Sequence, residues 1–192
     1  MNALPDRLPA RTRVLFVGIN PGLTSARVGH HFAGPSNRFW KLLFESGLTP
    51  ERLKPEDDYR VVSWGYGLTN LVPRPTAGIG SLRREEFLAG LPALRRKVAR
   101  LEPGVVALVG VTLFRVVFAV APESPVAPGL QQVRLSGSRV FVLPNPSGRN
   151  AHFSYAAMLR AFSELAAISA PDRRRRTASS RRRRTIELTP RS

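Results

Sequence analysis

The strongest constraint on the fold of this chain is a short apolar run that ends abruptly in a polar turn. Residues 14–17 are Val-Leu-Phe-Val, and residues 18–22 are Gly-Ile-Asn-Pro-Gly. A run of β-branched and aromatic residues that breaks at glycine and proline is typical of a buried strand followed by a turn. Because ligands of open α/β sheets bind at the carboxyl ends of the strands, Asn20 is a candidate site residue. The alternative is a turn asparagine that only satisfies its own backbone.

Apolar runs of this kind recur along the chain and alternate with stretches of helical spacing. We expect strands over residues 13–17, 68–72, 105–110 and 140–143, with a minor strand or hairpin arm at 133–138. We expect helices over 35–47, 82–101 with a break near Pro92, 112–120 and 155–168, and a loop without periodicity over 23–34. This alternation predicts a three-layer α/β/α domain with a mostly parallel central sheet of about four strands. The last strand ends in Pro-Asn-Pro-Ser-Gly, residues 144–148, so this turn and the 18–22 turn should share one sheet edge.

The chain divides into a polar leader at residues 1–12, one folded domain at 13–170 and an arginine-rich tail at 171–192. A length of 192 residues with 43% hydrophobic content suffices for one sizeable core. The tail holds nine arginines, eight of them in two blocks of four, and has no helical apolar face. We therefore expect the tail to be disordered.

The formal net charge of +17 points to a polyanionic partner. Of the 30 basic residues, 27 are arginine, whose guanidinium forks onto phosphates. Without the tail, 21 basic and 11 acidic residues leave a charge of +10, so the basic character is not confined to the tail. The tail should add sequence-independent phosphate contacts.

The absence of cysteine excludes disulfides, thiolate zinc sites and cysteine-ligated iron-sulfur clusters. The chain has no signal-like amino terminus and no apolar stretch of about 18 residues, which predicts a cytoplasmic protein, nucleoid-associated if bacterial, that does not enter a membrane. We expect a monomer without cofactor or metal. His30, His31 and His152 do not fit a metal site, because no carboxylate lies within their loop. Ser147 with His152 lacks the surroundings of a hydrolase dyad, and Gly-x-Gly-x-x-Gly is absent.

An asparagine is no base near neutral pH, but its amide can hold and aim a water molecule. Such a group suits hydrolysis through an oxocarbenium-like transition state in which the leaving group departs as a stabilised anion. Residues 14–22, 29–40 and 144–148 carry three motifs that closely resemble the mismatch-specific uracil and thymine DNA glycosylases of the uracil-DNA glycosylase superfamily. The resemblance runs from about Arg13 to Leu165 and includes residues 67–72.

The resemblance implies removal of uracil, with thymine and other damaged pyrimidines as further candidates, from G:U and G:T mispairs in double-stranded DNA. Such enzymes flip the nucleotide out of the duplex into a pocket. By this likeness Asn20 positions the attacking water, and Phe32 stacks on the base and offers it a backbone amide. The remaining residues that the likeness assigns to base binding are Ile19, Gly22, Ser25, His31 and Asn37.

The last motif resembles the loop that penetrates the duplex and contacts the widowed guanine. The residues assigned to this wedge are Asn145, Ser147, Gly148, Arg149 and Asn150. Arg149 stands where the bacterial pattern has leucine. An arginine at this position resembles the thymine-removing branch more closely, and so does the triplet of residues 29–31. This departure leaves the substrate range open.

Asn20 occupies the position at which the efficient uracil-specific branch has an aspartate, and this predicts slow turnover. Lys41, Lys54 and Lys97 lie outside the motifs, so we expect no Schiff-base lyase step and a product that is an abasic site. Two alternatives remain: a non-catalytic DNA-binding module on the same fold, and an enzyme that acts on a small phosphorylated substrate.

Overall fold

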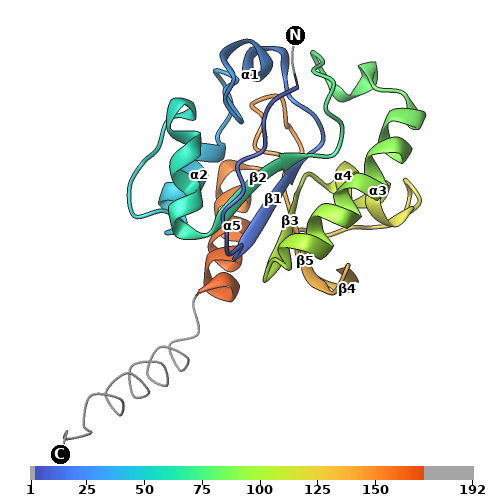
Figure 1. Ribbon diagram of the computed structural model, residues 1–192. Helices are drawn as coiled ribbons and strands as arrows, with labels where there is room; N and C mark the ends of the chain where they lie inside the picture. The colour runs from blue at the N-terminus through green and yellow to red at the C-terminus, as the bar shows by residue number, and fades with distance from the viewer. Residues whose placement is uncertain (1–2, 171–192) are drawn as a thin grey trace, which may run out of the picture.

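The computed structural model describes residues 3–170 and shows a central sheet with helices on both faces (Figure 1). The elements in chain order are β1 (Val14–Gly18), α1 (Leu23–Val28), α2 (Phe39–Glu45), η1 (Pro55–Trp64), β2 (Tyr66–Asn70), η2 (Ile79–Ser81), α3 (Arg84–Leu101), β3 (Val105–Val109), α4 (Val111–Phe118), β4 (Gly129–Leu135), β5 (Ser138–Leu143) and α5 (Tyr155–Ser169). The strand order is β2-β1-β3-β5-β4. All neighbours pair in parallel except β4, which is antiparallel to β5. The predicted α/β/α class is confirmed. The sheet has five strands, because the edge strand β4 precedes β5, and the arm expected over 133–138 covers the end of β4, the turn and the first residue of β5.

The alternation of side chains along β1 explains why helices cover both faces of the sheet. All five residues of β1 are buried. Val14 and Phe16 belong to the cluster that includes the apolar residues of α2 and α5. Leu15 and Val17 belong to the cluster that includes those of α3 and α4. Because successive side chains of a strand point to opposite faces, a continuous apolar run requires a cover on each side.

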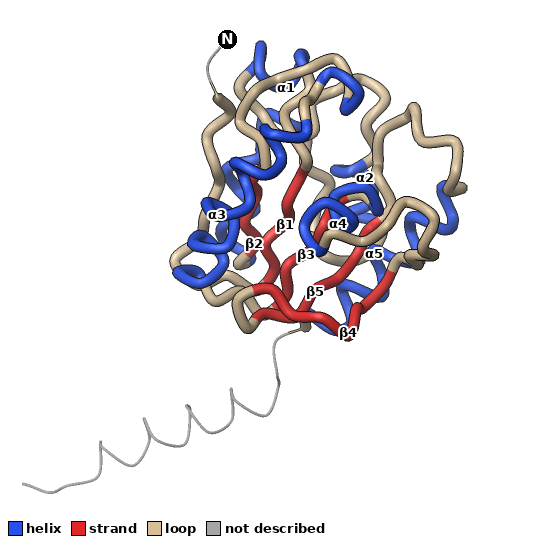
Figure 2. Tube along the Cα trace, turned by 90° about the vertical axis from the view of Figure 1, so that its right-hand side faces the viewer, coloured by secondary structure: helices blue, strands red, loops and turns tan. Residues whose placement is uncertain are grey.

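The parallel pairing places both polar turns at one edge of the sheet, as predicted. β1 and β5 each run parallel to β3, so the turns after Gly18 and after Leu143 leave the same edge. Figure 2 shows the loops that gather at this end, where α1 also lies. Asn70, the last residue of β2, is a third polar side chain there. A Cβ at Gly18 would lie 2.5 Å from Asn70 Oδ1, so any other residue at position 18 would displace the side chain of Asn70.

Two helical expectations were wrong. Residues 23–28, expected as loop, form the short helix α1, which ends where Gly29 adopts a left-handed φ of 79°. The helix over residues 84–101 is continuous across Pro92, where a break was expected. Proline has no N–H, so Pro92 leaves the carbonyl oxygen of Leu88 without its helical hydrogen bond. Both residues lie on the exposed side of α3, where water can bond to this oxygen.

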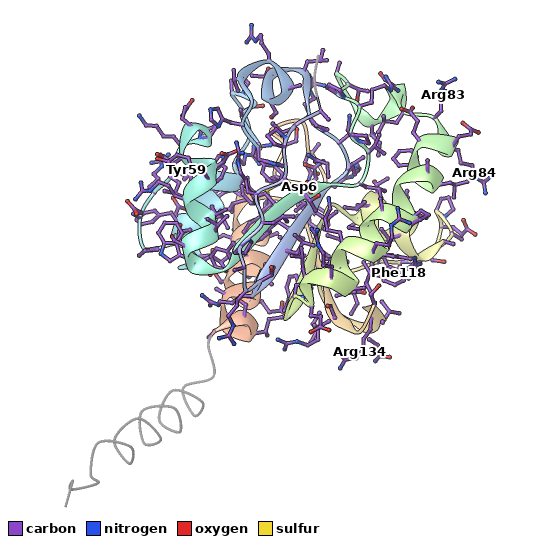
Figure 3. The ribbon with its side chains drawn as sticks, viewed as in Figure 1. Asp6, Tyr59, Arg83, Arg84, Phe118 and Arg134 are labelled. Carbon is purple, nitrogen blue, oxygen red and sulfur yellow. The ribbon has the colours of Figure 1, made fainter. Side chains whose placement is uncertain are left out.

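The residues that precede β1 pack against the sheet. Arg7 pairs antiparallel with Leu68 of β2, with backbone hydrogen bonds of 2.9 and 2.7 Å. Asp6, labelled in Figure 3, accepts a hydrogen bond from Thr69 and pairs with Lys97 of α3. This segment therefore covers the outer edge of β2. The predicted disorder of residues 171–192 lies outside the described residues. In the described part of the chain, no helix is long and apolar enough to cross a membrane.

Candidate active site

The side chain of Asn20 is held in one orientation by three acceptors. Its Nδ2 donates to the carbonyl oxygens of Arg74 at 3.0 Å and Pro21 at 3.2 Å, and to Thr76 Oγ1 at 2.8 Å. Because carbonyl oxygens only accept, these contacts fix which end of the amide is the NH₂ group. Within residues 3–170, no group donates a hydrogen bond to Asn20 Oδ1. This oxygen is therefore available as an acceptor.

Thr76 can act only as an acceptor toward Asn20. Its hydroxyl donates its one proton to Gly78 O at 2.8 Å, which leaves a lone pair for Asn20 Nδ2. Thr76 is 5% exposed, and its backbone N–H donates to Pro21 O at 3.1 Å. The loop after β2 is thus joined to the turn after β1 by both backbone and side-chain contacts.

An ion pair holds Arg74, whose carbonyl oxygen is another of the three acceptors of Asn20. Arg74 pairs with Glu86 of α3, with hydrogen bonds of 2.6 and 2.8 Å. The guanidinium of Arg74, followed by the backbone N–H of Arg83, lowers the pKa of Glu86 to about 2. Glu86 is therefore ionised at neutral pH and anchors the residue whose carbonyl contacts Asn20.

Phe32 lies on an aromatic stack that begins in β1. Its ring is stacked on Phe39 of α2 with centroids 3.8 Å apart and an interplanar angle of 19°. Phe39 packs edge-on against Phe16 of β1 at 5.3 Å. Phe32 is only partly buried, so ring surface remains accessible beside Phe39. Its φ of 52° is left-handed, which is uncommon for a bulky residue.

The peptide groups on either side of Phe32 are held, while its own N–H is free. Ser25 Oγ accepts a hydrogen bond from Ala33 N at 3.0 Å, and Trp40 Nε1 donates to His31 O at 3.1 Å. Within the described residues, no acceptor bonds to Phe32 N–H. The loop therefore presents one backbone donor next to a partly open aromatic ring.

His31 supports this loop from within the protein. It is 2% exposed, and its Nε2 lies 3.0 Å from Pro5 O in the segment before β1. Burial lowers the pKa of His31, so the neutral imidazole is favoured. Its backbone N–H donates to Asp58 Oδ2 at 3.0 Å. The side chain of His31 has little surface left for a base.

The remaining predicted base-binding residues lie around the same edge. Asn37 Oδ1 accepts a hydrogen bond from Phe39 N at 3.0 Å, which orders the start of α2. Ile19 is partly buried against the core cluster that includes α3 and α4. Gly22 is exposed at the start of α1, with no atom within 4 Å of where its Cβ would be.

The loop after β5 is tied to the start of α2. Pro146 O accepts a hydrogen bond from Arg38 N at 3.0 Å, and a Cβ at Gly148 would lie 2.8 Å from Ser36 O. Only glycine allows this approach of the two backbones. Within the loop, Asn145 Oδ1 accepts from Ser147 N at 3.0 Å, and Asn145 O accepts from Asn150 Nδ2 at 2.8 Å. The loop is thus ordered by its own polar side chains.

Arg149 is exposed at the tip of this loop. Its guanidinium donates to Ala77 O at 2.9 Å, in the loop that also carries Thr76. The structure therefore brings the turn with Asn20, the loop with Phe32 and the loop with Arg149 to one edge of the sheet.

Three supporting residues were missed by the sequence reasoning: Arg7, Asp58 and Thr76. Each acts through a contact with a residue at least 22 positions away, which no local pattern reveals. Asn70 also lies at this edge, because β2 ends there, two residues before the end of the strand expected over 68–72.

Two surface hollows lie at the opposite edge of the sheet. One is lined by Arg11, Arg13 and Arg139, among others, and the second shares Gly104 and Arg139 with it. The guanidinium groups of Arg13 and Arg139 bond to the carbonyl oxygens of Ser169 and Ile168 at the end of α5. These arginines therefore satisfy a helix terminus, and the hollows contain no predicted site residue. Within residues 3–170, no group of three His, Asp or Glu side chains could hold a metal ion.

Comparison with known proteins agrees with this fold. The sequence profile of the Uracil DNA glycosylase superfamily matches residues 5–166. The chain therefore belongs to the uracil DNA glycosylase superfamily. This membership supports a hydrolase of the DNA glycosylase type that acts on uracil in DNA and serves DNA repair.

A solved structure shares the fold. The solution NMR structure of a candidate uracil DNA glycosylase from Methanosarcina acetivorans superposes with a TM-score of 0.60 at 19% sequence identity. The match covers 88% of this chain and 98% of that protein. At this identity the likeness bears on the fold alone.

Proposed function

We propose that this chain is a monofunctional DNA glycosylase that removes uracil from mispairs with guanine and leaves an abasic site. The observation that carries the proposal is the fixed amide of Asn20, whose oxygen is free while its nitrogen is held by Arg74 O and Thr76 Oγ1. An amide oriented in this way accepts a hydrogen bond from a water molecule and aims the water oxygen at the sugar carbon.

The leaving base is stabilised by Phe32 in this proposal. Its ring offers a flat face for stacking, which contributes about 1 to 3 kcal/mol per base. Its free N–H is placed to donate to a pyrimidine oxygen as negative charge develops there. Stacking selects flat rings in general, so uracil, thymine and other damaged pyrimidines are all candidate substrates.

Water attack here proceeds without a strong base. Within the described residues, no carboxylate bonds to Asn20 or to Thr76, and Glu86 is engaged by Arg74. A positioned general base contributes about 10²- to 10⁴-fold in rate. This site therefore supports slow turnover that depends on the stability of the departing anion.

Arg149 is proposed to enter the duplex and contact the widowed guanine. An arginine bonds in bidentate fashion to guanine acceptors more readily than to the other bases. The exposed position of Arg149 at the tip of an ordered loop supports this role. The arginine-rich tail is proposed to add phosphate contacts that do not depend on sequence.

The test is base release from end-labelled duplexes that carry one G:U, G:T or A:U pair, read as strand nicks after alkali. We expect release at G:U by the native chain and none by Asn20→Ala, with duplex binding retained by both. Release at G:T would extend the substrate range to thymine. Binding without release from any duplex would refute the proposal and favour a DNA-binding module.

A further inference from the structure

The buried carboxylate of Asp58 has no part in the chemistry proposed above, and neither does the side chain of His30 or His31. We propose that Asp58 and Arg7 form a clamp that sets the position of Phe32, which makes Asp58 a positioning residue for base stacking. The inference rests on the proposed function, because it assigns a purpose to Asp58 only if Phe32 contacts the flipped base.

The position of Asp58 is unusual for a charged side chain. It lies in η1 and is 0% exposed. Its Oδ2 accepts a hydrogen bond from the backbone N–H of His31 at 3.0 Å, and its Oδ1 accepts one from Arg7 Nε at 2.9 Å. His30 Nδ1 lies 3.4 Å from the same Oδ1. A buried carboxylate is costly unless it is paired, and here its two oxygens join the loop before Phe32 to the amino-terminal segment.

Arg7 is itself fixed to the sheet. Its backbone N–H and carbonyl both pair with Leu68 of β2, and its guanidinium also donates to Gly29 O at 3.3 Å. The clamp therefore holds residues 29 and 31 at once and joins both of them to the outer edge of β2. Phe32 is the next residue along the chain.

The conformation of Phe32 explains why a clamp is needed. A left-handed backbone at a phenylalanine persists only where the surroundings determine it strongly. Three side chains form hydrogen bonds with the peptide groups around it. Asp58 accepts from His31 N, Trp40 donates to His31 O, and Ser25 accepts from Ala33 N. Asp58 provides the charged hydrogen bond of the three, and charge-assisted bonds are the stronger kind.

Relaxation of this backbone would move both groups that Phe32 offers to a base. The ring would lose its alignment on Phe39, where the planes now differ by 19°. The free N–H of Phe32 would turn with it. Loss of the clamp should therefore reduce base release through Phe32 and not through Asn20.

The experiment compares Asp58→Asn with the matched control Asp57→Asn. An asparagine at 58 accepts at only one atom, so its NH₂ group must face either His31 N–H or Arg7 Nε. We expect single-turnover release of uracil from a G:U duplex to fall about ten- to hundredfold. Asp57→Asn removes the same charge from a neighbouring side chain that is partly exposed and accepts a hydrogen bond from Lys54 N. This control variant should keep the native rate.

A double-mutant cycle with Phe32→Ala separates positioning from general stability. If Asp58 acts through Phe32, the loss of rate from Asp58→Asn should be clearly smaller in the Phe32→Ala background than in the native chain, because only the displaced backbone N–H of residue 32 then contributes to it. The effect of Asp58→Asn on the melting temperature should be the same in both backgrounds. Additive losses of rate would overturn the proposal. If Asp58→Asn does not fold, Arg7→Gln replaces it in the same cycle, with the same two outcomes.

The two proposals fail in distinguishable ways. If the native chain releases no base from any duplex, the proposed glycosylase function fails and the clamp proposal fails with it. If the native chain releases uracil and Asn20→Ala does not, while the losses from Asp58→Asn and Phe32→Ala add, only the clamp is refuted.

Discussion

Replacing Thr76 by valine keeps the shape of the side chain but removes the hydroxyl that accepts from Asn20 Nδ2 at 2.8 Å. The same change removes the donor to Gly78 O, also at 2.8 Å. The Asn20 amide keeps its bond to Arg74 O, which is in an exposed position. We therefore expect Asn20 to remain in place with a less defined orientation.

The size of the effect follows from the hydrogen bonds that are lost. A neutral hydrogen bond contributes about 0.5 to 1.5 kcal/mol net, and a partner left unsatisfied adds to the loss. Because the contact between Asn20 and Thr76 is only partly buried, water can satisfy part of what is lost. We expect the barrier to base release to rise by about 1 to 2 kcal/mol, which is about five- to thirtyfold in rate.

Single-turnover release of uracil from a G:U duplex, with enzyme in excess, measures this barrier directly. Thr76→Ser, which keeps the hydroxyl, should stay close to the native rate. A native rate for Thr76→Val, or an equal loss for both substitutions, would refute the idea that this hydroxyl orients the Asn20 amide.

Three further predictions concern recognition, pH and the tail. Arg149→Leu should reduce the preference for G:U over A:U pairs by about 1 to 3 kcal/mol in single-turnover assays, whereas an equal loss at both pairs would indicate a phosphate contact. Glu86 has a pKa near 2 in place of 4.5, so its contribution to stability is complete above pH 4.5 and is lost as the pH falls toward 2. In unfolding measured as a function of pH, Glu86→Gln should lose less stability than the native chain between pH 4.5 and 2. An equal loss in both proteins would contradict this role of the ion pair. Truncation after Ala170 should lower duplex affinity and flatten the dependence of log K on log salt, because fewer counterions are released, and an unchanged slope would exclude the tail from DNA binding.

The layers of the fold and the shared edge of the two turns could be predicted because they follow from local patterns. Apolar runs with no polar member, such as residues 14–17 and 105–109, require cover on both faces, and their alternation with helices requires parallel pairing. α1 could not be predicted, because its six residues have no apolar period and no polar cap. The continuity of α3 past Pro92 also escaped prediction, since the burial of Leu94 and Val98 against the sheet decides it.

The candidate site was predictable only as far as its motifs reach. Asn20 and Phe32 stand in motifs, but what orients them lies elsewhere in the chain. Thr76 is 56 residues from Asn20, and Asp58 is 27 residues from His31. The segment before β1 looked like a plain leader because the partners of Arg7 become visible only when the chain has folded.

The contact between the loop after β5 and the start of α2 has a kinetic consequence. Pro146 O is bonded to Arg38 N, and Gly148 lies against Ser36 without room for a Cβ. If the roles proposed above for Arg149 and Phe32 hold, the loop that enters the stack of DNA bases and the loop that receives the extruded nucleotide are therefore joined and move together. Filling the gap in the duplex and capturing the base should then occur as one concerted event. A fluorescent base analogue placed beside the mispair should report a single exponential phase, with no separate intermediate in which the duplex is opened and the pocket is empty.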